Sequence, residues 1–518
     1  MKRVRAAASL ALLLAAAWAG VWLIQRAVRV DRGQVDGARL LDAVMVRVRD
    51  SYVDSVDTER MWELATVGLL DELGDPNSTY LTPERLERLE RTAANSYVGV
   101  GLQVDVRDGW VTVTQPRPGS PAERAGILAG DKLVEVDGRS MDGWTVEEAR
   151  RAFRGPPGSA LALTVERGSA RDARLRFTLE RAELVNRSVS RAAVLEGGVG
   201  YVAIVTFSDS TETELVAVID SLRAAGARSL ILDLRGNPGG LLAQGVRVAD
   251  LFLGSGQRIV STQGRVPQAN AVYTDSTPER WPGLLVSVLV NHLTASAAEI
   301  VAGALQDHDR ALIVGRATYG KGSAQAIYRL ENGAAISLTN ARWVTPLGRS
   351  IEYPAEDETR LADAPPDRPR FRTAMGRTVL GGGGIVPDVA TVDSIAELGE
   401  RRFAIELGDR VRDFRDLARG IAERHAKAGD VVDTLFAAPA AWRDELYRAL
   451  ERSGIVVSIV TFDEARGMVD RTLGVEAVRA AFGSAAVPRW IARTDPTIVR
   501  AAEALRRARS ARDVLSVD

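Results

Sequence analysis

The apolar residues of this chain follow three different spacings in turn. Over residues 35–95 they recur every three or four positions, as in ARLLDAVMVRVRDSYV, which predicts amphipathic helices. From residue 96 apolar and polar positions alternate, in GLQVDV and WVTVTQ on either side of the turn Asp108-Gly109, which predicts a β-hairpin. From about residue 199 short, wholly apolar runs alternate with helical patterns, which predicts an α/β core with buried strands.

The predicted core is followed by a long helical region. Strands are predicted at VGYVAIVTF, SLILDLRG, LLVSVLVN, ALIVG, GSAQAIYRL and AAISLTNARWVTP. Residues 381–389, GGGGIVPDV, are predicted to form a loop that closes the core, and residues 395–518 to form helices without a recognisable catalytic group. In such folds, sites usually lie at the turns that lead from a strand into a helix.

These patterns predict a multidomain α/β protein, because 518 residues are too many for one ordinary domain. We predict an N-terminal targeting segment, an N-terminal helical region, a small β-barrel-like domain with helices, an α/β core and a C-terminal helical region. Their predicted bounds are 1–30, 31–95, 96–183, 184–394 and 395–518.

The amino-acid composition excludes several classes of functional site. A net charge of −1, from 67 basic and 68 acidic residues, provides no overall field that would hold nucleic acid. The chain has no cysteine, which excludes disulfides, thiolate catalysis and cysteine-based zinc sites. It has three histidines, so we expect no histidine-rich metal site, and we predict no metal or cofactor.

The first residues predict export. MKRVR precedes residues 6–24, which carry no charge and would span about 28 Å as a helix at ~1.5 Å per residue, close to a hydrocarbon core of ~30 Å. The basic start and the alanines at 15–17 also suit a cleavable signal peptide. We favour a retained anchor in the inner (cytoplasmic) membrane, and under either alternative the body is exported, to the periplasm or another extracytoplasmic space.

Ser296 stands where the apolar run LLVSVLVN gives way to a helical pattern, in NHLTASAAEIVAGAL. A serine that begins a helix is commonly a cap, because its hydroxyl accepts an orphan backbone N–H. The same amides favour developing negative charge, so Ser296 is also a candidate nucleophile, which would need a base. The G-x-S-x-G elbow of lipases is absent around it, and nothing in the sequence places His292 against its hydroxyl.

Lys321 is the candidate base. It is the one lysine in the middle of the chain, and arginine cannot act as a base near neutrality. A lysine can, where burial lowers its pKa. Gly320 and Gly322 on either side allow the backbone an unusual path, and in an extended segment Lys321 would share a face with Ser323 and Gln325. The Gln325 amide could then orient the amine, while the alternative is a solvated loop lysine.

Residues 96–138 and the helix and strand that follow resemble a PDZ domain over about 85 residues. The resemblance implies that a peptide adds as a strand beside GLQVDV, with its terminal carboxylate on the backbone N–H groups of Gly99, Val100, Gly101 and Leu102. Adjacent amides converge on an anion only where the backbone turns tightly, which is a physical reason for the glycines. The alternative is a hairpin entry loop without a ligand.

The stretch VNHLTASAAEIVAGALQDHDRALIVGRATYGKGSAQ resembles the carboxyl-terminal processing, or tail-specific, proteases, which are PDZ-containing serine peptidases with a Ser/Lys dyad. LDLRGNPGG, ARWVTPLGRSI, GGGIVPDV, SYVDSVD and DPNSTYL also match, so the resemblance covers roughly residues 40–395. It implies a crotonase/ClpP-like core, with Ser296 as nucleophile, Lys321 as general base and Gln325 as the glutamine that positions the lysine.

The resemblance also implies an oxyanion hole and a regulatory residue. One donor would be the N–H of Ala297, if Ser296 begins a helix. The second would come from the NPGG turn, from Gly239 or Gly240, and we favour Gly240. Arg154 matches an arginine that couples occupancy of the PDZ domain to assembly of the active site, although it could equally be a surface residue that caps a helix.

The expected function is therefore that of a serine endopeptidase that binds C-terminal tails of exported proteins through its PDZ domain and hydrolyses their peptide bonds. The expected partners are proteins or peptides with free C-termini and the membrane, with an activating adaptor or self-association left open and no nucleic acid. A catalytically inert PDZ adaptor or scaffold is the alternative. A crotonase-like enzyme acting on acyl thioesters is less favoured, since it would need neither the PDZ domain nor Lys321.

Overall fold

The computed structural model of the chain describes residues 32–93, 95–107, 109–167, 174–353, 368–391, 394–483 and 486–516. The apolar segment predicted at 6–24 lies outside these residues. Within them, no helix has the length and apolar character that crossing a membrane requires. The chain divides into two units, one made of residues 1–82 and 326–338 and the other of residues 83–325 and 339–518.

The first unit consists of helices and a short strand pairing. It contains α2 (Arg32–Ser51), α3 (Thr58–Asp71) and β1 (Thr79–Leu81), which pairs antiparallel with the start of β18 (Ala335–Val344). Leu70, Tyr80 and Ala334 form its small buried cluster. The helices agree with the pattern over 35–95, whereas β1 was not predicted. Its three residues are too few to show alternation.

The second unit begins with α4 (Pro83–Ala93) and the β-rich segment predicted to resemble a PDZ domain. Its main sheet has the order β3-β4-β5-β7-β8, so β3 (Leu102–Arg107) is an edge strand. β3 pairs antiparallel with β4 (Trp110–Pro116), which confirms the predicted hairpin. The other elements are β2 (Ser96–Gly99), α5 (Pro121–Arg124), β5 (Lys132–Val136), β6 (Arg139–Ser140), α6 (Val146–Phe153), β7 (Ala160–Glu166), β8 (Arg174–Glu180) and β9 (Ala182–Val185).

The α/β core is built on a six-stranded sheet. Its order is β10 (Val189–Leu195), β11 (Val199–Ile204), β12 (Ser229–Asp233), β15 (Leu285–Val290), β16 (Ala311–Gly315) and β21 (Val389–Ala390). All neighbours are parallel except β10 and β11. The apolar runs coincide with the central strands, because a strand covered on both faces needs apolar side chains in both directions.

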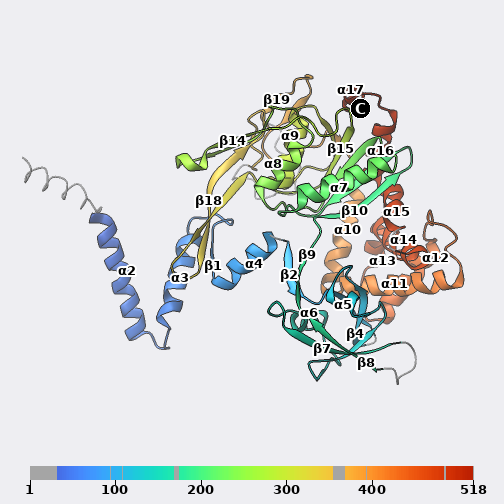
Figure 1. Cartoon of the computed structure of the whole chain (residues 1–518), viewed down its shortest axis with the longest axis horizontal. Coiled ribbons are helices and arrows are strands. Elements are labelled where there is room, and N and C mark those ends of the chain that lie inside the picture. The colour runs from blue at the N-terminus through green and yellow to red at the C-terminus, as the bar shows by residue number, and fades with distance from the viewer. Residues whose placement is uncertain are drawn as a thin grey trace, which may run out of the picture. The chain divides into compact units, whose positions relative to one another are not determined.

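Helices cover both faces of this sheet (Figure 1). Val202 and Ile204 of β11 pack in one buried cluster with α7 (Thr211–Ala224), α8 (Leu242–Asp250) and α9 (Ala297–Asp307). Tyr201 and Ala203, the alternate residues of the same strand, pack in another cluster with α16 (Pro496–Arg507). The C-terminal region is therefore part of the core, because α16 supplies one of its covering layers.

Smaller elements complete the second unit. The sequence reading missed the antiparallel pairing of β13 (Arg258–Gly264) with β14 (Ala271–Thr274). The end of β18 also pairs with β13, and β17 (Ser323–Arg329) pairs with β18. The 3₁₀ helix η1 (Pro267–Ala269) lies between β13 and β14, and β19 (Arg370–Arg372) pairs antiparallel with β20 (Thr378–Leu380). The helical C-terminal region was predicted correctly: it contains α10 (Ser394–Leu407), η2 (Gly408–Arg410), α11 (Val411–Ala428), α12 (Ala440–Arg452), α13 (Ile459–Glu464), α14 (Arg466–Phe482), α15 (Val487–Thr494) and α17 (Ala511–Leu515).

Candidate active site

Ser296 lies directly before α9, at the junction that the sequence indicated. Its φ of 55° and ψ of −119° place it in a backbone conformation that residues other than glycine rarely adopt. Such a conformation persists only where the surroundings enforce it, and it is most frequent at functional sites. The first turn of α9 is closed by backbone bonds, since the Glu299 N–H donates to the Ser296 carbonyl at 2.8 Å.

Glu299, in the first turn of α9, joins Ser296 to the lysine loop. Its carboxylate is fully buried, and one oxygen, Oε2, accepts from the backbone N–H of both Ser296, at 2.7 Å, and Lys321, at 2.9 Å. The other oxygen accepts from the Gly320 N–H at 2.7 Å and from the Thr318 hydroxyl. The two backbone nitrogens of Ser296 and Lys321 therefore lie within two hydrogen-bond lengths of each other.

The burial of Glu299 also changes its titration. Removal from water raises the pKa of its carboxyl group to about 7, while the four hydrogen bonds that it accepts oppose this rise. α9 is buried along its whole length, which is why a carboxylate in its first turn has no route to solvent. The sequence reading did not single out Glu299.

Lys321 lies in the turn that precedes β17. Its carbonyl accepts from the Trp343 indole N–H at 3.1 Å, and its side chain is partly buried. Gly320 is required here, because it has a φ of 83° and an added Cβ would lie 2.7 Å from the Tyr353 ring. Because β17 begins at Ser323, Lys321 stands outside the strand, so the expected strand face that it would share with Ser323 and Gln325 does not include it.

Gln325 lies within β17, and its amide is held by two hydroxyls. Its Nε2 donates to Ser323 Oγ at 3.0 Å and to Thr339 Oγ1 at 3.1 Å. These bonds use the donor side of the amide and fix its plane, which leaves the carbonyl oxygen as the group that can accept from an amine.

The NPGG turn lies against the Ser296 backbone. A Cβ added to Gly239 would be 2.8 Å from Ser296 Cβ and 3.0 Å from the Ala297 nitrogen, so only glycine fits there. The Gly239 N–H donates to Asn237 Oδ1 at 2.8 Å. Among the described residues the Gly240 N–H donates to no protein acceptor, while a Cβ at Gly240 would lie 2.1 Å from the Phe207 carbonyl. The turn is therefore tightly fixed beside the start of α9.

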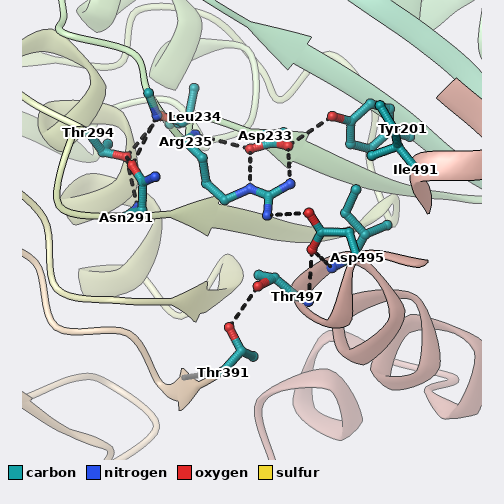
Figure 2. A network of polar contacts seen from close by, with 12 residues as sticks. Tyr201, Asp233, Leu234, Arg235, Asn291, Thr294, Thr391, Ile491, Asp495 and Thr497 are labelled. Atoms are coloured by element: carbon teal, nitrogen blue, oxygen red, sulfur yellow. Dashed lines mark hydrogen bonds and ion pairs between the residues drawn. The ribbon is translucent and has the colours of Figure 1, made fainter. Parts of the chain in front are cut away.

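A partly buried ion-pair network fixes the strand end before this turn (Figure 2). The Arg235 guanidinium donates to both oxygens of Asp233, at 2.9 and 2.8 Å, and to Asp495 Oδ2 at 2.8 Å. Tyr201 donates its hydroxyl to Asp233 at 2.8 Å. Burial lowers the pKa of Arg235, but the two carboxylates outweigh it and raise that pKa above its ordinary value. Asp495 also caps α16, with Oδ1 accepting from the Thr497 N–H.

Two further bonds connect this strand end to the loop before Ser296 (Figure 2). Thr294 Oγ1 donates to the Leu234 carbonyl at 2.9 Å, and the Gly236 N–H donates to Asn291 Oδ1 at 3.0 Å. The C-terminal helix α16, the NPGG turn and the Ser296 loop therefore form one connected network. The sequence reading missed it, because 260 positions separate Arg235 from Asp495.

The proposed carboxylate nest lines a cleft of about 830 Å³. Gly99, Val100, Gly101 and Leu102 run from the end of β2 to the start of β3, and a Cβ at Gly101 would be 2.2 Å from Ser120 Cβ. Among the described residues, the charged side chains that line this cleft are all arginines: Arg117, Arg150, Arg154 and Arg187. The cleft therefore suits an anionic group. Arg154, the candidate regulatory residue, follows the end of α6 and lines it too.

No group of three or more histidine, aspartate or glutamate side chains within the described residues has the arrangement of a metal site.

Known protein families match both the core and the β-rich segment of this chain. Residues 198–357 match peptidase family S41, and residues 112–167 match the PDZ domain family. The chain is 37% identical over 317 residues to a carboxy-terminal-processing protease of Bartonella bacilliformis, covering 60% of this chain and 71% of that protein. It is 33% identical over 311 residues to the carboxy-terminal processing protease CtpA of Bacillus subtilis, covering 60% and 66%. A solved photosystem II D1 C-terminal processing protease aligns at 27% identity over 69% of this chain and 93% of that one, with a TM-score of 0.37.

The sequence matches therefore show that the chain belongs to the carboxy-terminal processing proteases, and that it is a serine-type peptidase of family S41 with a PDZ domain.

Proposed function

We propose that Ser296 and Lys321 form the catalytic dyad of this peptidase. The observation that carries the proposal is the buried Glu299 carboxylate, whose single oxygen Oε2 accepts from the backbone amides of both residues. These two bonds hold Ser296, in its unusual backbone conformation, next to the loop that carries Lys321 between Gly320 and Gly322. A serine nucleophile needs such a base, and a partly buried lysine can supply it.

In the proposed reaction the neutral Lys321 amine takes the Ser296 hydroxyl proton as Oγ attacks the scissile carbonyl carbon. The resulting oxyanion accepts from the N–H groups of Ala297 and Gly240, which lie at the helix start and the NPGG turn. Lys321 then returns the proton to the departing amine, leaving an acyl-serine that water hydrolyses with the same lysine as base. Gln325 orients the lysine amine through its carbonyl oxygen.

We propose Gly240 over Gly239 as the second oxyanion donor. The Gly239 N–H already donates to Asn237, whereas the Gly240 N–H has no protein acceptor within the described residues. A donor that is to bind developing charge must be held in place but not occupied.

Selection of substrate is proposed to begin at the C-terminus. The nest, residues 99–102, leads into the edge strand β3, which begins at Leu102, and the arginines of its cleft suit a terminal carboxylate. The names of the relatives, which describe carboxy-terminal processing, support the same substrate class. Residues 6–24 support export and anchoring in the cytoplasmic membrane, so the substrates would be exported proteins.

The proposed regulatory role of Arg154 rests on its place at the nest cleft. If it couples tail binding to catalysis, Arg154→Ala should retain basal cleavage of an unstructured substrate while losing stimulation by a free C-terminal peptide. Unchanged stimulation would leave Arg154 as a surface residue at the end of α6.

A cleavage assay tests the dyad and the inert-scaffold alternative together. Ser296→Ala and Lys321→Ala should each lower cleavage of a denatured protein by about 10³-fold or more. The matched controls are Ser255→Ala and Lys427→Ala, at exposed positions outside the site, which should cleave like the parent. Equal activity in parent and Ser296→Ala would refute the proposed dyad.

A further inference from the structure

A second cleft, of about 840 Å³, continues from the carboxylate nest along β3. The two clefts share Gln103 and Arg150, so they form one groove. One wall of the second cleft comes from β3, β4 and α6 of the PDZ domain. The opposite wall comes from α11 and α14 of the C-terminal helical region.

The direction of a bound tail follows from the position of the nest. A peptide whose carboxylate lies at the start of β3, and which adds as a strand to that edge, runs along β3 with its earlier residues toward Asp105. With its C-terminal residue beside Leu102 and both strands rising ~3.3 Å per residue, the residues one to three positions before that last residue lie beside residues 103–105. Those positions face the second cleft and the helices of its far wall.

α11 is fixed to the edge strand by a charged contact. Arg419 Nη1 donates to Asp105 Oδ2 at 2.9 Å, and its guanidinium also lies 3.1 Å from Asp416 and 3.5 Å from Glu476 of α14. Three carboxylates therefore surround the Arg419 guanidinium, and 26% of the Arg419 side chain is exposed to solvent. The contact holds the helix beside the groove and leaves Arg419 little positive charge to offer a ligand.

Three other arginines of the second cleft have a positive charge that no neighbouring carboxylate neutralises. Arg412 and Arg415, one helical turn apart on α11, are exposed, as is Arg150 on α6. Among the described residues none of the three forms an ion pair within 4.0 Å. Within the same part of the chain, Glu423 is the one acidic residue of the lining that forms no ion pair. The second cleft therefore offers more unpaired positive than negative charge.

We infer that the C-terminal helical region forms the outer wall of the peptide groove and selects tails with aspartate or glutamate one to three residues before the C-terminal residue. This inference rests on the proposed capture of C-terminal tails by the PDZ domain. Arg412 and Arg415 on α11, with Arg150 across the groove, supply the attraction. The carboxylate nest reads the end of the tail, and the second cleft reads its preceding residues.

Peptide binding to the full-length Ser296→Ala protein tests this inference without cleavage. The probes are fluorescein-labelled decapeptides that end in valine, preceded by three aspartates, three glutamines or three lysines. At low salt the aspartate peptide should bind about tenfold more tightly than the glutamine peptide and the lysine peptide more weakly, with the differences shrinking as salt rises. Adding Arg412→Glu and Arg415→Glu should reverse this order and leave the glutamine peptide unchanged.

The control variant carries Arg448→Glu and Arg452→Glu on α12, two exposed arginines outside both clefts, and should keep the original order. Equal binding of the three peptides, or a parallel change for all three in the α11 variant, would overturn the inference while leaving tail capture intact. Failure of every peptide to bind would overturn tail capture itself.

Discussion

Arg235 and Asp495, 260 positions apart, are joined by a 2.8 Å ion pair that connects the strand end before the NPGG turn to the N-cap residue of α16. Both side chains are largely shielded from solvent, with 21% and 20% of their surface exposed. The C-terminal region is therefore bonded to the strand end that leads into the NPGG turn, where the proposed oxyanion donor lies.

Asp495→Asn should lower kcat more than it changes KM. Asparagine still caps α16, so the substitution isolates the ion pair with Arg235. Loss of one partner of a mostly buried pair should cost about 1–3 kcal/mol of stability. A looser NPGG turn should lower kcat several-fold, measured in a peptide cleavage assay beside thermal unfolding. Glu196→Gln, which breaks the exposed pair with Arg493, is the control and should cost under ~1 kcal/mol. Unaltered kcat in Asp495→Asn would show that the pair is only structural.

Gly239→Ala and Gly240→Ala should each lower kcat by about 10²-fold or more. The added methyl group at Gly239 would meet Ser296, and at Gly240 it would meet the Phe207 carbonyl, so the turn must move and the proposed donor with it. Gly236→Ala is the matched control, because it has a φ of 70° but open space around its Cβ. It should lose about 1 kcal/mol of stability and retain most activity. Similar losses of kcat in all three variants would argue against a specific role for the two glycines.

Glu299 should make stability fall as pH rises. Its carboxyl has a pKa of about 7 in the folded chain against an ordinary value of 4.5, so the folded state holds the proton more tightly than the unfolded state does. The stability that this proton contributes is complete below about pH 4.5 and is lost as pH rises through 7, by roughly 3 kcal/mol at most. Denaturant unfolding of the parent and of Glu299→Gln between pH 5 and 8 measures it.

The difference in stability between the parent and Glu299→Gln should change with pH in that window, in the direction that favours the parent at pH 5. A pH-independent difference would show that Glu299 titrates as an ordinary carboxyl. Glu299→Gln should also lose kcat, because an amide group offers one acceptor oxygen where Ser296, Lys321 and Gly320 need two.

The parts of the fold that a regular pattern specifies were predictable from the sequence. Apolar runs located the central strands of the core, and alternation located the β3–β4 hairpin. β13 and β14 were missed, since RIVSTQG and AVYT are short and mixed in character. α16 was predicted as a helix, but its packing on the core sheet depends on contacts with residues some 200 to 300 positions away, which no local pattern encodes.

The candidate site was predicted where a residue type had few alternatives. Ser296 stood at a strand-to-helix junction, and Lys321 was the one lysine available between two glycines. Glu299 was missed because a glutamate in a helix is ordinarily a solvated residue. The signal lay in its neighbours: AAEIVAGAL is apolar on every side, so its one carboxylate had to be internal. Asp495 was not predicted as part of the site, because its partner Arg235 lies 260 positions earlier in the sequence.

The absence of cysteine allows the most direct measurement of the proposed base. In Lys321→Cys the new thiol is unique, and alkylation with 2-bromoethylamine, verified by mass spectrometry, replaces the lysine with a thioether analogue whose amine has a lower pKa. We expect Lys321→Cys to lose activity by about 10³-fold or more, and the alkylated protein to regain it with the acid limb of its pH–rate profile moved to lower pH. Full activity in unmodified Lys321→Cys, or no recovery after complete alkylation, would contradict the assignment of Lys321 as the base for Ser296.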